Sequence, residues 1–265
     1  MSEPPVKYNV AFAKGHGLQD ETIALLRAWA PGMTNTELTA AALQQGLLRR
    51  ATAKRTQDII FGHIAPRYFI DQGRPARYLK ILLESGLPAS ALNQLFFIYT
   101  CRANPILRDF IGQVYWPSFQ AGRTTIIKEQ ALEFIDLAVQ AGHIPVPWTS
   151  DLRDVIARGL MTCLADFDLA EKGRVSGRKL RPFQVSQLTT FYLAHELHFI
   201  GLNDNQIMTH PDWQLFGLTP VEVVYELQHL PTRHLIVQFS GDLLRISWIL
   251  SSMEEALDAI AAREL

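Results

Sequence analysis

The chain has 265 residues, of which 48% are hydrophobic, so it can bury one large core or two medium ones and disorder is not expected as its main state. Its 25 Lys and Arg residues nearly balance 26 Asp and Glu residues, which excludes a uniformly basic surface and leaves room only for local basic patches. We find no apolar stretch of secretory type near the N-terminus and no segment with the ~20 apolar residues of a membrane span, so we expect a cytoplasmic protein without membrane contact.

The N-terminal part of the chain begins with signals for two short helices. Apolar residues recur at helical spacing over residues 20–30, and the Pro-Gly pair that follows them ends this helix. Thr34 lies three residues before Glu37, which is the pattern of a capping box, and Gly46 can end the second helix with a positive φ.

A third helix follows after a turn. Thr52 is a suitable N-cap, and the helical pattern runs to Ala65, where Pro66 is expected to end it. Lys54 and Arg55 fall on the face opposite the apolar one, since successive residues turn by about 100° around a helix. The second and third helices therefore form a predicted helix-turn-helix with a charged outer face.

The remainder of the N-terminal half continues as helices. The expected segments are 74–84, 89–102, 105–115 and 124–141, separated by breaks that contain Pro or Gly. One of these breaks is Trp116-Pro117. The two prolines of His143–Trp148 make a stiff extended segment, which we take as the domain boundary. The predicted domains are residues 1–145, with the helix-turn-helix, and residues 146–265, with a winged-helix-like element.

The C-terminal half combines helices with a minor β component. Helical signals cover 150–164, 186–200 and 253–265, residues 219–222 form a second capping box with Pro at the first helical position, and the segment 234–239 is the clearest strand. The segment 172–181 holds five basic residues and no acidic one, and Ser176-Gly177 could form the turn of a small hairpin wing. The predicted fold class is mainly α: a helical bundle with helix-turn-helix and winged-helix-like elements.

Two groups of basic residues carry the functional prediction. Between residues 45 and 80 there are eight basic residues and two acidic ones. Positively charged side chains at turns and helix ends bind DNA phosphates, and short hydroxyl side chains add hydrogen bonds to the DNA. The predicted DNA-binding residues are Arg49, Arg50, Thr52, Lys54, Arg55, Thr56 and Arg67 near the first turn, and Lys172, Arg174, Arg178, Lys179 and Arg181 in the second group. We call Arg49, Arg50, Lys54 and Arg55 the first basic cluster, and the five residues of 172–181 the second.

Each cluster has a simpler interpretation that the sequence leaves open. The first could be an ordinary solvated helix end, with Lys54 paired to Asp58 one turn later. The second could be an exposed loop.

No motif indicates catalysis or a bound cofactor. His195 and His198 are three apart rather than the four that a zinc-protease helix needs, and Gly15-His-Gly17 lacks the spacing of a dinucleotide loop. Cys101 and Cys163 match no metal-binding spacing, so we interpret them as buried free thiols. We therefore predict no catalytic residue, metal, cofactor or small-molecule substrate, although a site assembled from distant residues stays open.

The order of the motifs resembles the BrxA family of bacterial bacteriophage-exclusion (BREX) systems. The resemblance lies in Tyr8–Gly15, in a helix ending at Trp29, and in the helix-turn-helix of 34–67; it continues through 107–110 and 160–200. It implies a mainly helical protein that binds double-stranded DNA within a multi-protein phage-defence system, and other BREX proteins are then further partners.

These observations lead to two functional hypotheses. The first is a non-catalytic double-stranded DNA-binding component that grips phosphates, with weak sequence preference and strong salt dependence. The second is a protein-interaction adaptor that docks other defence components without binding DNA, its basic residues serving only solubility.

Overall fold

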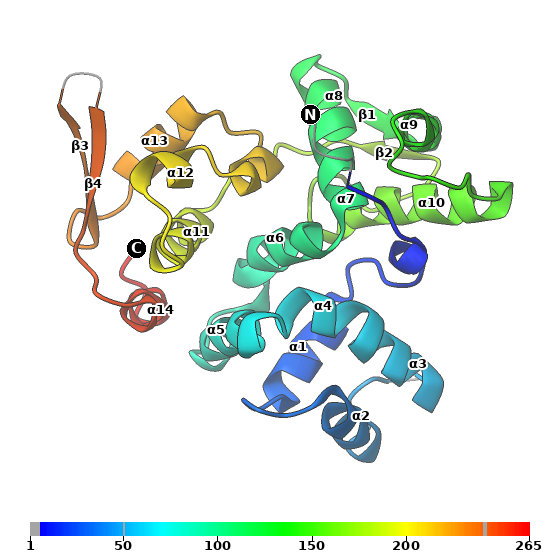
Figure 1. Ribbon diagram of the computed structural model, residues 1–265, viewed down its shortest axis with the longest axis horizontal. Helices are drawn as coiled ribbons and strands as arrows, with labels where there is room; N and C mark the ends of the chain where they lie inside the picture. The colour runs from blue at the N-terminus through cyan, green and yellow to red at the C-terminus, as the bar shows by residue number, and fades with distance from the viewer. Residues whose placement is uncertain (1–5, 50, 241–242) are drawn as a thin grey trace. The chain divides into compact units, whose positions relative to one another are not determined.

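The computed structural model describes residues 6–49, 51–240 and 243–265, and the chain divides into two compact units (Figure 1). Unit 1 comprises residues 1–77 and 96–183, and unit 2 comprises residues 78–95 and 184–265. The chain passes between them within α5 (Arg74–Glu84) and α6 (Asn93–Ala103). Each unit is therefore discontinuous in sequence.

The domain boundary expected after residue 145 falls inside unit 1. Ile144 is buried there, and the backbone N–H of Tyr8 donates to the carbonyl of His143 at 2.9 Å. The Pro-rich segment is thus packed against the N-terminal part of its own unit and does not act as a linker.

Unit 1 is built mostly of helices, which confirms the predicted mainly α class. Its first part holds η1 (Val10–Lys14), α1 (Gln19–Ala28), α2 (Asn35–Gln44), α3 (Ala53–Ile59), η2 (Ile60–Ile64), α4 (Ala65–Tyr68) and η3 (Asp71–Gly73). Its second part holds α7 (Pro105–Phe110), η5 (Ile111–Tyr115), α8 (Trp116–Gln120), β1 (Thr125–Ile127), α9 (Lys128–Gln140), α10 (Ser150–Asp166) and β2 (Gly177–Lys179).

Two prolines lie inside helices that they were expected to end. A π-helical turn precedes each of them: η2 before Pro66 and η5 before Pro117. In these turns the N–H groups of Ala65 and Trp116 donate to carbonyls five residues back. The wider turn makes room where a proline ring would otherwise meet the carbonyl four residues before it. The prediction that the third helix ends at Ala65 is therefore wrong, and this helix runs on to Tyr68.

The N-terminal segment of unit 1 packs into the helices rather than lying free. The Tyr8 hydroxyl donates to Asp109 Oδ2 at 2.7 Å, and the Tyr8 ring stacks on His143. Further along, His16 lies so close to α10 that a Cβ added at Gly159 would lie 2.2 Å from its Nε2 atom. Glycine at position 159 is what allows this close approach.

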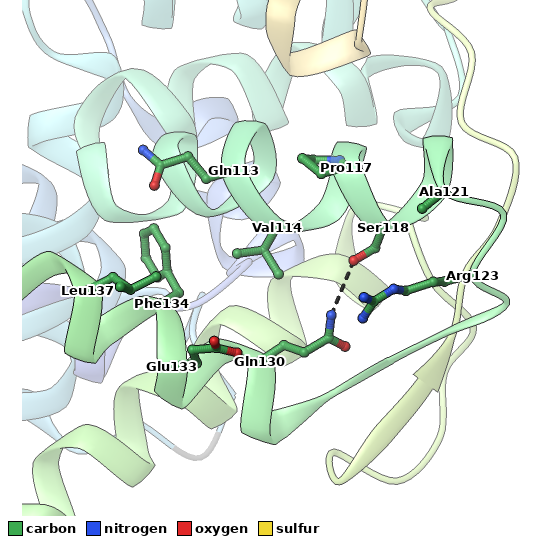
Figure 2. Close-up of a pocket in the computed structure, with 10 residues that line it drawn as sticks. All are labelled: Gln113, Val114, Pro117, Ser118, Ala121, Arg123, Gln130, Glu133, Phe134 and Leu137. Carbon is green, nitrogen blue, oxygen red and sulfur yellow. Dashed lines mark hydrogen bonds between the residues drawn. The ribbon is translucent and has the colours of Figure 1, made fainter.

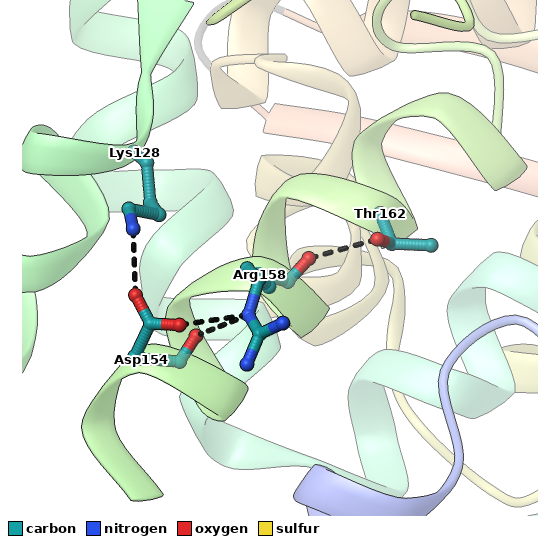
Figure 3. Close-up of polar contacts among 4 residues, drawn as sticks. All are labelled: Lys128, Asp154, Arg158 and Thr162. Carbon is teal, nitrogen blue, oxygen red and sulfur yellow. Dashed lines mark hydrogen bonds and ion pairs between the residues drawn. The ribbon is translucent and has the colours of Figure 1, made fainter. Parts of the chain in front are cut away.

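Helices α9 and α10 pack side by side and share an ion-pair network (Figure 3). Asp154 of α10 accepts from Lys128 Nζ at 2.6 Å, and its other carboxylate oxygen lies 2.8 Å from Nε of Arg158. The two cations hold the pKa of Asp154 below its usual value. Since all three side chains are partly exposed, the network orients α9 on α10 without contributing much stability.

Unit 2 surrounds the buried helix α11 (Gln187–Phe199), whose residues from Thr189 to Leu197 are all buried. The other elements are η4 (Ala89–Leu92), α12 (Asp204–Met208), η6 (Pro211–Phe216), α13 (Pro220–Gln228), β3 (Leu235–Ser240), β4 (Leu243–Trp248) and α14 (Met253–Ala261). β3 and β4 form an antiparallel hairpin, with Leu235 opposite Trp248. The strand predicted over 234–239 and the helix predicted over 186–200 are confirmed.

The hairpin of unit 2 is fixed to its helices by Asp204 and by aromatic packing. The Asp204 carboxylate accepts from the Ile246 backbone N–H at 2.8 Å and from the Trp248 indole N–H at 3.2 Å. Trp248 stacks on His198 and meets His195 edge-on. Because burial lowers the pKa of His195 to about 4, this contact forms with the neutral imidazole at pH 7.

Candidate nucleic-acid interface

Helices α2 and α3 lie where the helix-turn-helix was predicted, and residues 45–49 and 51–52 belong to the segment between them. The α2 N-terminus has the expected capping box: the Thr34 N–H donates to Glu37 Oε2 at 2.8 Å, and the Glu37 N–H donates to Thr34 Oγ1 at 3.2 Å. Thr52 caps α3 by accepting from the Arg55 N–H at 3.2 Å. Helix α2 packs on both α1 and α3, so the three helices hold the turn and the start of α3 in place.

The first basic cluster lies on this turn and on the start of α3. Arg49 and Lys54 are exposed and Arg55 is partly exposed, whereas Arg50 lies outside the described residues. In the described part of the chain no carboxylate lies within 4 Å of these three cations, and Lys54 makes no ion pair with Asp58. The Lys54–Asp58 pair considered from sequence is therefore not observed, and a solvated helix end without that pair stays compatible with the arrangement.

Acidic residues do lie near one edge of the cluster. Asp20 and Glu21, at the start of α1, line the same hollow of about 380 Å³ as Arg49. Their charge offsets part of the positive potential around Arg49, so Lys54 and Arg55 carry more of the exposed charge.

Two further residues predicted for this surface are buried instead. Thr56 is 2% exposed and Arg67 is 1% exposed, so neither can reach a phosphate. The Arg67 guanidinium donates to the backbone carbonyls of Gly15 at 2.7 Å and Gly17 at 3.1 Å. Arg67 therefore clamps the loop before α1 onto the α3–α4 helix, which corrects its assignment as a DNA contact.

Two neutral histidines accompany Arg67 in this interior. Burial lowers the pKa of His63 to about 4 and also lowers that of His16, and the charge of Arg67 lowers both further. Gly15 lies against the His63 ring, where an added Cβ would come within 2.3 Å of Nδ1. The Gly-His-Gly loop is thus a packing element, in keeping with its lack of a nucleotide-binding pattern.

The second basic cluster lies on a local antiparallel reversal that also pairs with a distant strand. Strand β2 pairs antiparallel with β1, with Arg178 opposite Ile126, so the ladder joins two distant segments. The chain does reverse at Val175-Ser176, where the Gly177 N–H donates to the Arg174 carbonyl, and Ala170 bridges to Leu180. The reversal is local, but the strand's main partner is β1, which the sequence pattern places inside a helix.

Most of the positive charge in the second cluster is used internally. Arg178 is 6% exposed and its guanidinium donates to the Glu171 carbonyl. Lys179 pairs with Glu171 at 3.0 Å, and Arg181 pairs with Asp168 at 3.2 Å. Lys172 and Arg174 are exposed, and no ion pair within 4 Å involves them in the described ranges. The second cluster therefore offers less unpaired charge than the first.

An apolar groove, not predicted from the sequence, lies along α3. It has a volume of about 920 Å³ and runs between η1, α2, α3 and η2. Its exposed apolar residues are Val10, Leu43 and Phe61, which are 50%, 45% and 43% exposed, and Lys54 and Asp58 also line it. We call it the α3 groove. The sequence signal for this groove was an apolar residue on an otherwise polar helix face. From the sequence alone, such a residue cannot be distinguished from one that packs in the core.

A smaller hollow of about 340 Å³ lies between α8 and α9 (Figure 2). Gln130 Nε2 donates to Ser118 Oγ at 3.2 Å, and Arg123 points toward this pair. Phe134 and Leu137 line the opposite side, so the hollow has one polar end and one apolar end. It contains no arrangement of nucleophile and base that would suggest catalysis.

Residues considered for metal or thiol chemistry are accounted for by packing. Within residues 6–49, 51–240 and 243–265, no three His, Cys, Asp or Glu side chains gather closely enough to hold a metal ion. Cys101 and Cys163 are free and buried, and burial raises the pKa of Cys163 to about 12. A thiol with a raised pKa is a poor nucleophile.

The near-neutral charge of the chain conceals two oppositely charged units. From residue 184 onward unit 2 has ten acidic and three basic residues, and Lys80 and Glu84 cancel in its first segment, so its formal charge is −7. The total of −1 leaves +6 for unit 1, from 21 basic and 15 acidic residues. The exposed cations of α3 thus belong to a basic unit.

Comparisons with known proteins place the chain in a family. A crystal structure of an uncharacterized protein from Magnetospirillum magneticum is similar in fold, with a TM-score of 0.59 and 15% identity; the match covers 73% of this chain and 95% of that one. No curated protein matches. Among the described residues, no helix combines the length and apolarity that crossing a membrane requires. The family model of BrxA matches residues 6–196, and the chain therefore belongs to the BrxA family of BREX phage-defence systems.

Proposed function

We propose that this protein is a non-catalytic double-stranded DNA-binding component of its defence system and that unit 1 makes the contact. The observation that carries the proposal is a set of cations at the α2–α3 turn, the exposed Arg49 and Lys54 and the partly exposed Arg55, which have no carboxylate within 4 Å in the described part of the chain. Unpaired cations at a helix N-terminus favour phosphate, since the helix dipole adds positive potential there.

Recognition through phosphates follows from what the rest of α3 presents. Thr52 is engaged as the cap, Thr56 is buried, and the exposed positions farther along the helix include Phe61. Gln57 is the exposed amide on this helix that could read a base edge. With so few groups for base readout, the chain should show weak sequence preference and strong salt dependence.

Lys172 and Arg174 would add a minor contribution, because they are the exposed members of the second cluster without an ion pair within 4 Å among the described residues. Lys179 and Arg181 would have to give up their contacts with Glu171 and Asp168 to reach a phosphate.

Charge reversal with a matched control tests this proposal. The variant Arg49→Glu/Lys54→Glu/Arg55→Glu should weaken duplex binding at least about 100-fold in a fluorescence-anisotropy titration at low salt, since three phosphate contacts become repulsions. The control Lys172→Glu/Arg174→Glu should cost less than about 10-fold. Absence of wild-type binding at low salt, or equal losses in the two variants, would refute the assignment.

The adaptor hypothesis is favoured by a different observation, the exposed apolar residues of the α3 groove. An exposed apolar patch commonly marks a protein interface. If the protein acts only as an adaptor, the triple charge reversal should leave its assembly with other defence components intact and the wild type should show no DNA affinity.

A further inference from the structure

Helix α13 of unit 2 presents an exposed apolar ridge. Val221 is 79% exposed and Tyr225 is 60% exposed, and they lie four residues apart on the same helix face. The start of α13 is well fixed, because Thr219 and Glu222 form a capping box and Pro220 occupies the first helical turn. The ridge is therefore a preformed, rigid helix face, which lowers the entropic cost of docking.

The surroundings of this ridge are acidic. Glu222 and Glu226 are on α13 itself, and unit 2 carries a formal charge of −7. Such a charge repels a nucleic acid, so α13 is poorly suited to bind DNA even though a helix followed by a β-hairpin is the order found in winged helices.

The α3 groove of unit 1 has complementary properties. Its exposed apolar side chains, Leu43 and Phe61, can receive a helix face, and Lys54 lies on its lining in a unit of charge +6. A volume of about 920 Å³ is in the range that holds several side chains of an amphipathic helix. Asp58 lies on the same lining, so the groove matches α13 in its apolar character, whereas the charge complementarity is between the two units as wholes.

We propose that this protein associates head to tail, with the Val221–Tyr225 ridge of one copy docked in the α3 groove of another. The two surfaces are different patches of the same chain, so the contact is heterologous and each bound pair leaves one ridge and one groove free. Association should therefore continue beyond a dimer as concentration rises. Salt should weaken it, because units of opposite charge attract each other.

Sedimentation equilibrium of the full-length protein without DNA tests this directly. The weight-average mass of the wild type should rise steadily with concentration at low salt and fall toward that of one chain as NaCl is added. A mass that stays at one chain over the whole concentration range would overturn the proposal and would leave the groove to another protein.

Two complementary variants then test the geometry. Leu43→Glu places a carboxylate in the groove, and Val221→Glu places one on the ridge, so each alone should be monomeric. Mixed in equal amounts they should form a species of twice the mass of one chain and no larger, because a single intact ridge and a single intact groove remain. A mixture that stays monomeric, or single variants that associate as the wild type does, would contradict head-to-tail docking.

The control is Leu137→Glu, which makes the same change at an exposed leucine of α9 outside both surfaces. It should associate like the wild type. If Leu43→Glu loses its native circular dichroism, Phe61→Gln on the other wall of the groove provides the second groove-blocked variant. Because these assays contain no DNA, their outcome is independent of the DNA-binding proposal.

Discussion

Helices α3 and α13 both begin at a threonine cap, yet they present opposite chemistry to solvent. Thr52 starts a helix with Lys54 and Arg55 in its first turn, whereas Thr219 starts one with Val221 exposed and Glu222 in its first turn. The units that carry them have formal charges of +6 and −7. A cap pattern therefore locates a helix, but the side chains of its exposed face decide whether DNA or a protein can bind it.

The largest effect on stability is expected when a buried arginine of unit 1 is replaced, in comparison with an exposed one. Arg67→Leu leaves the carbonyls of Gly15 and Gly17 without their donor and should lower the free energy of unfolding by about 4 kcal/mol. Arg49→Leu removes an exposed side chain and should change it by less than about 0.5 kcal/mol. Urea denaturation of both variants checks this; equal losses would mean that the clamp is not structural.

Acid should destabilise both units through their buried histidines. The pKa values of His63 and His195 lie at about 4, below the ordinary value near 6.5, so the unfolded chain binds their protons first. The stability that comes from keeping these histidines neutral is fully present above pH 6.5 and is lost as the pH falls toward 4. At pH 5 the loss in unfolding free energy is about 2 kcal/mol for each histidine.

A variant isolates the contribution of unit 2 to this pH dependence. The unfolding free energy should be measured at pH 7 and at pH 5 for the wild type and for His195→Leu. The drop between the two pH values should be smaller in His195→Leu than in the wild type by about 2 kcal/mol. His229→Leu, which changes an exposed histidine, serves as the control. If the two variants show the same pH dependence as the wild type, His195 is not an acid-sensitive element of unit 2.

Much of the fold follows from local signals, which is why α5 and β3 lie where the sequence predicts them. Capping boxes and Gly stops act within one turn and can be recognised in sequence. Pro66 and Pro117 mislead because a π turn, set by packing, accommodates each ring. The strand β1 is also hidden, since its partner β2 lies about 50 residues away.

The candidate site was predicted in part. Arg49 and Lys54 are exposed and Arg55 is partly exposed at the expected turn, but charge alone does not reveal burial. In the sequence Arg67 looks like one more cation of a basic stretch, and only the fold shows that its guanidinium is enclosed by backbone carbonyls. The unequal charge of the two units likewise depends on discontinuous boundaries that no composition shift marks.

A smaller effect is expected from the cap that holds the cations of α3. Thr52→Ala removes the acceptor of the Arg55 N–H and should cost about 1 kcal/mol of stability, with a loss of DNA affinity of a few fold because the helix start loosens. Thr219→Ala should cost similar stability with no change in DNA affinity. Loss of affinity in Thr219→Ala would assign DNA contacts to unit 2 and so undo the contrast between α3 and α13.

The salt dependence of duplex binding tests the central claim most directly. Neutralising the cluster in Arg49→Gln/Lys54→Gln/Arg55→Gln should flatten the slope of log affinity against log salt by about 0.9 for each phosphate that the variant no longer neutralises, a total of roughly 2 to 3. Measured for the wild type and this variant on the same duplex, that change would identify α3 as the phosphate-binding helix. An unchanged slope would contradict the account and place the DNA contact elsewhere in the protein.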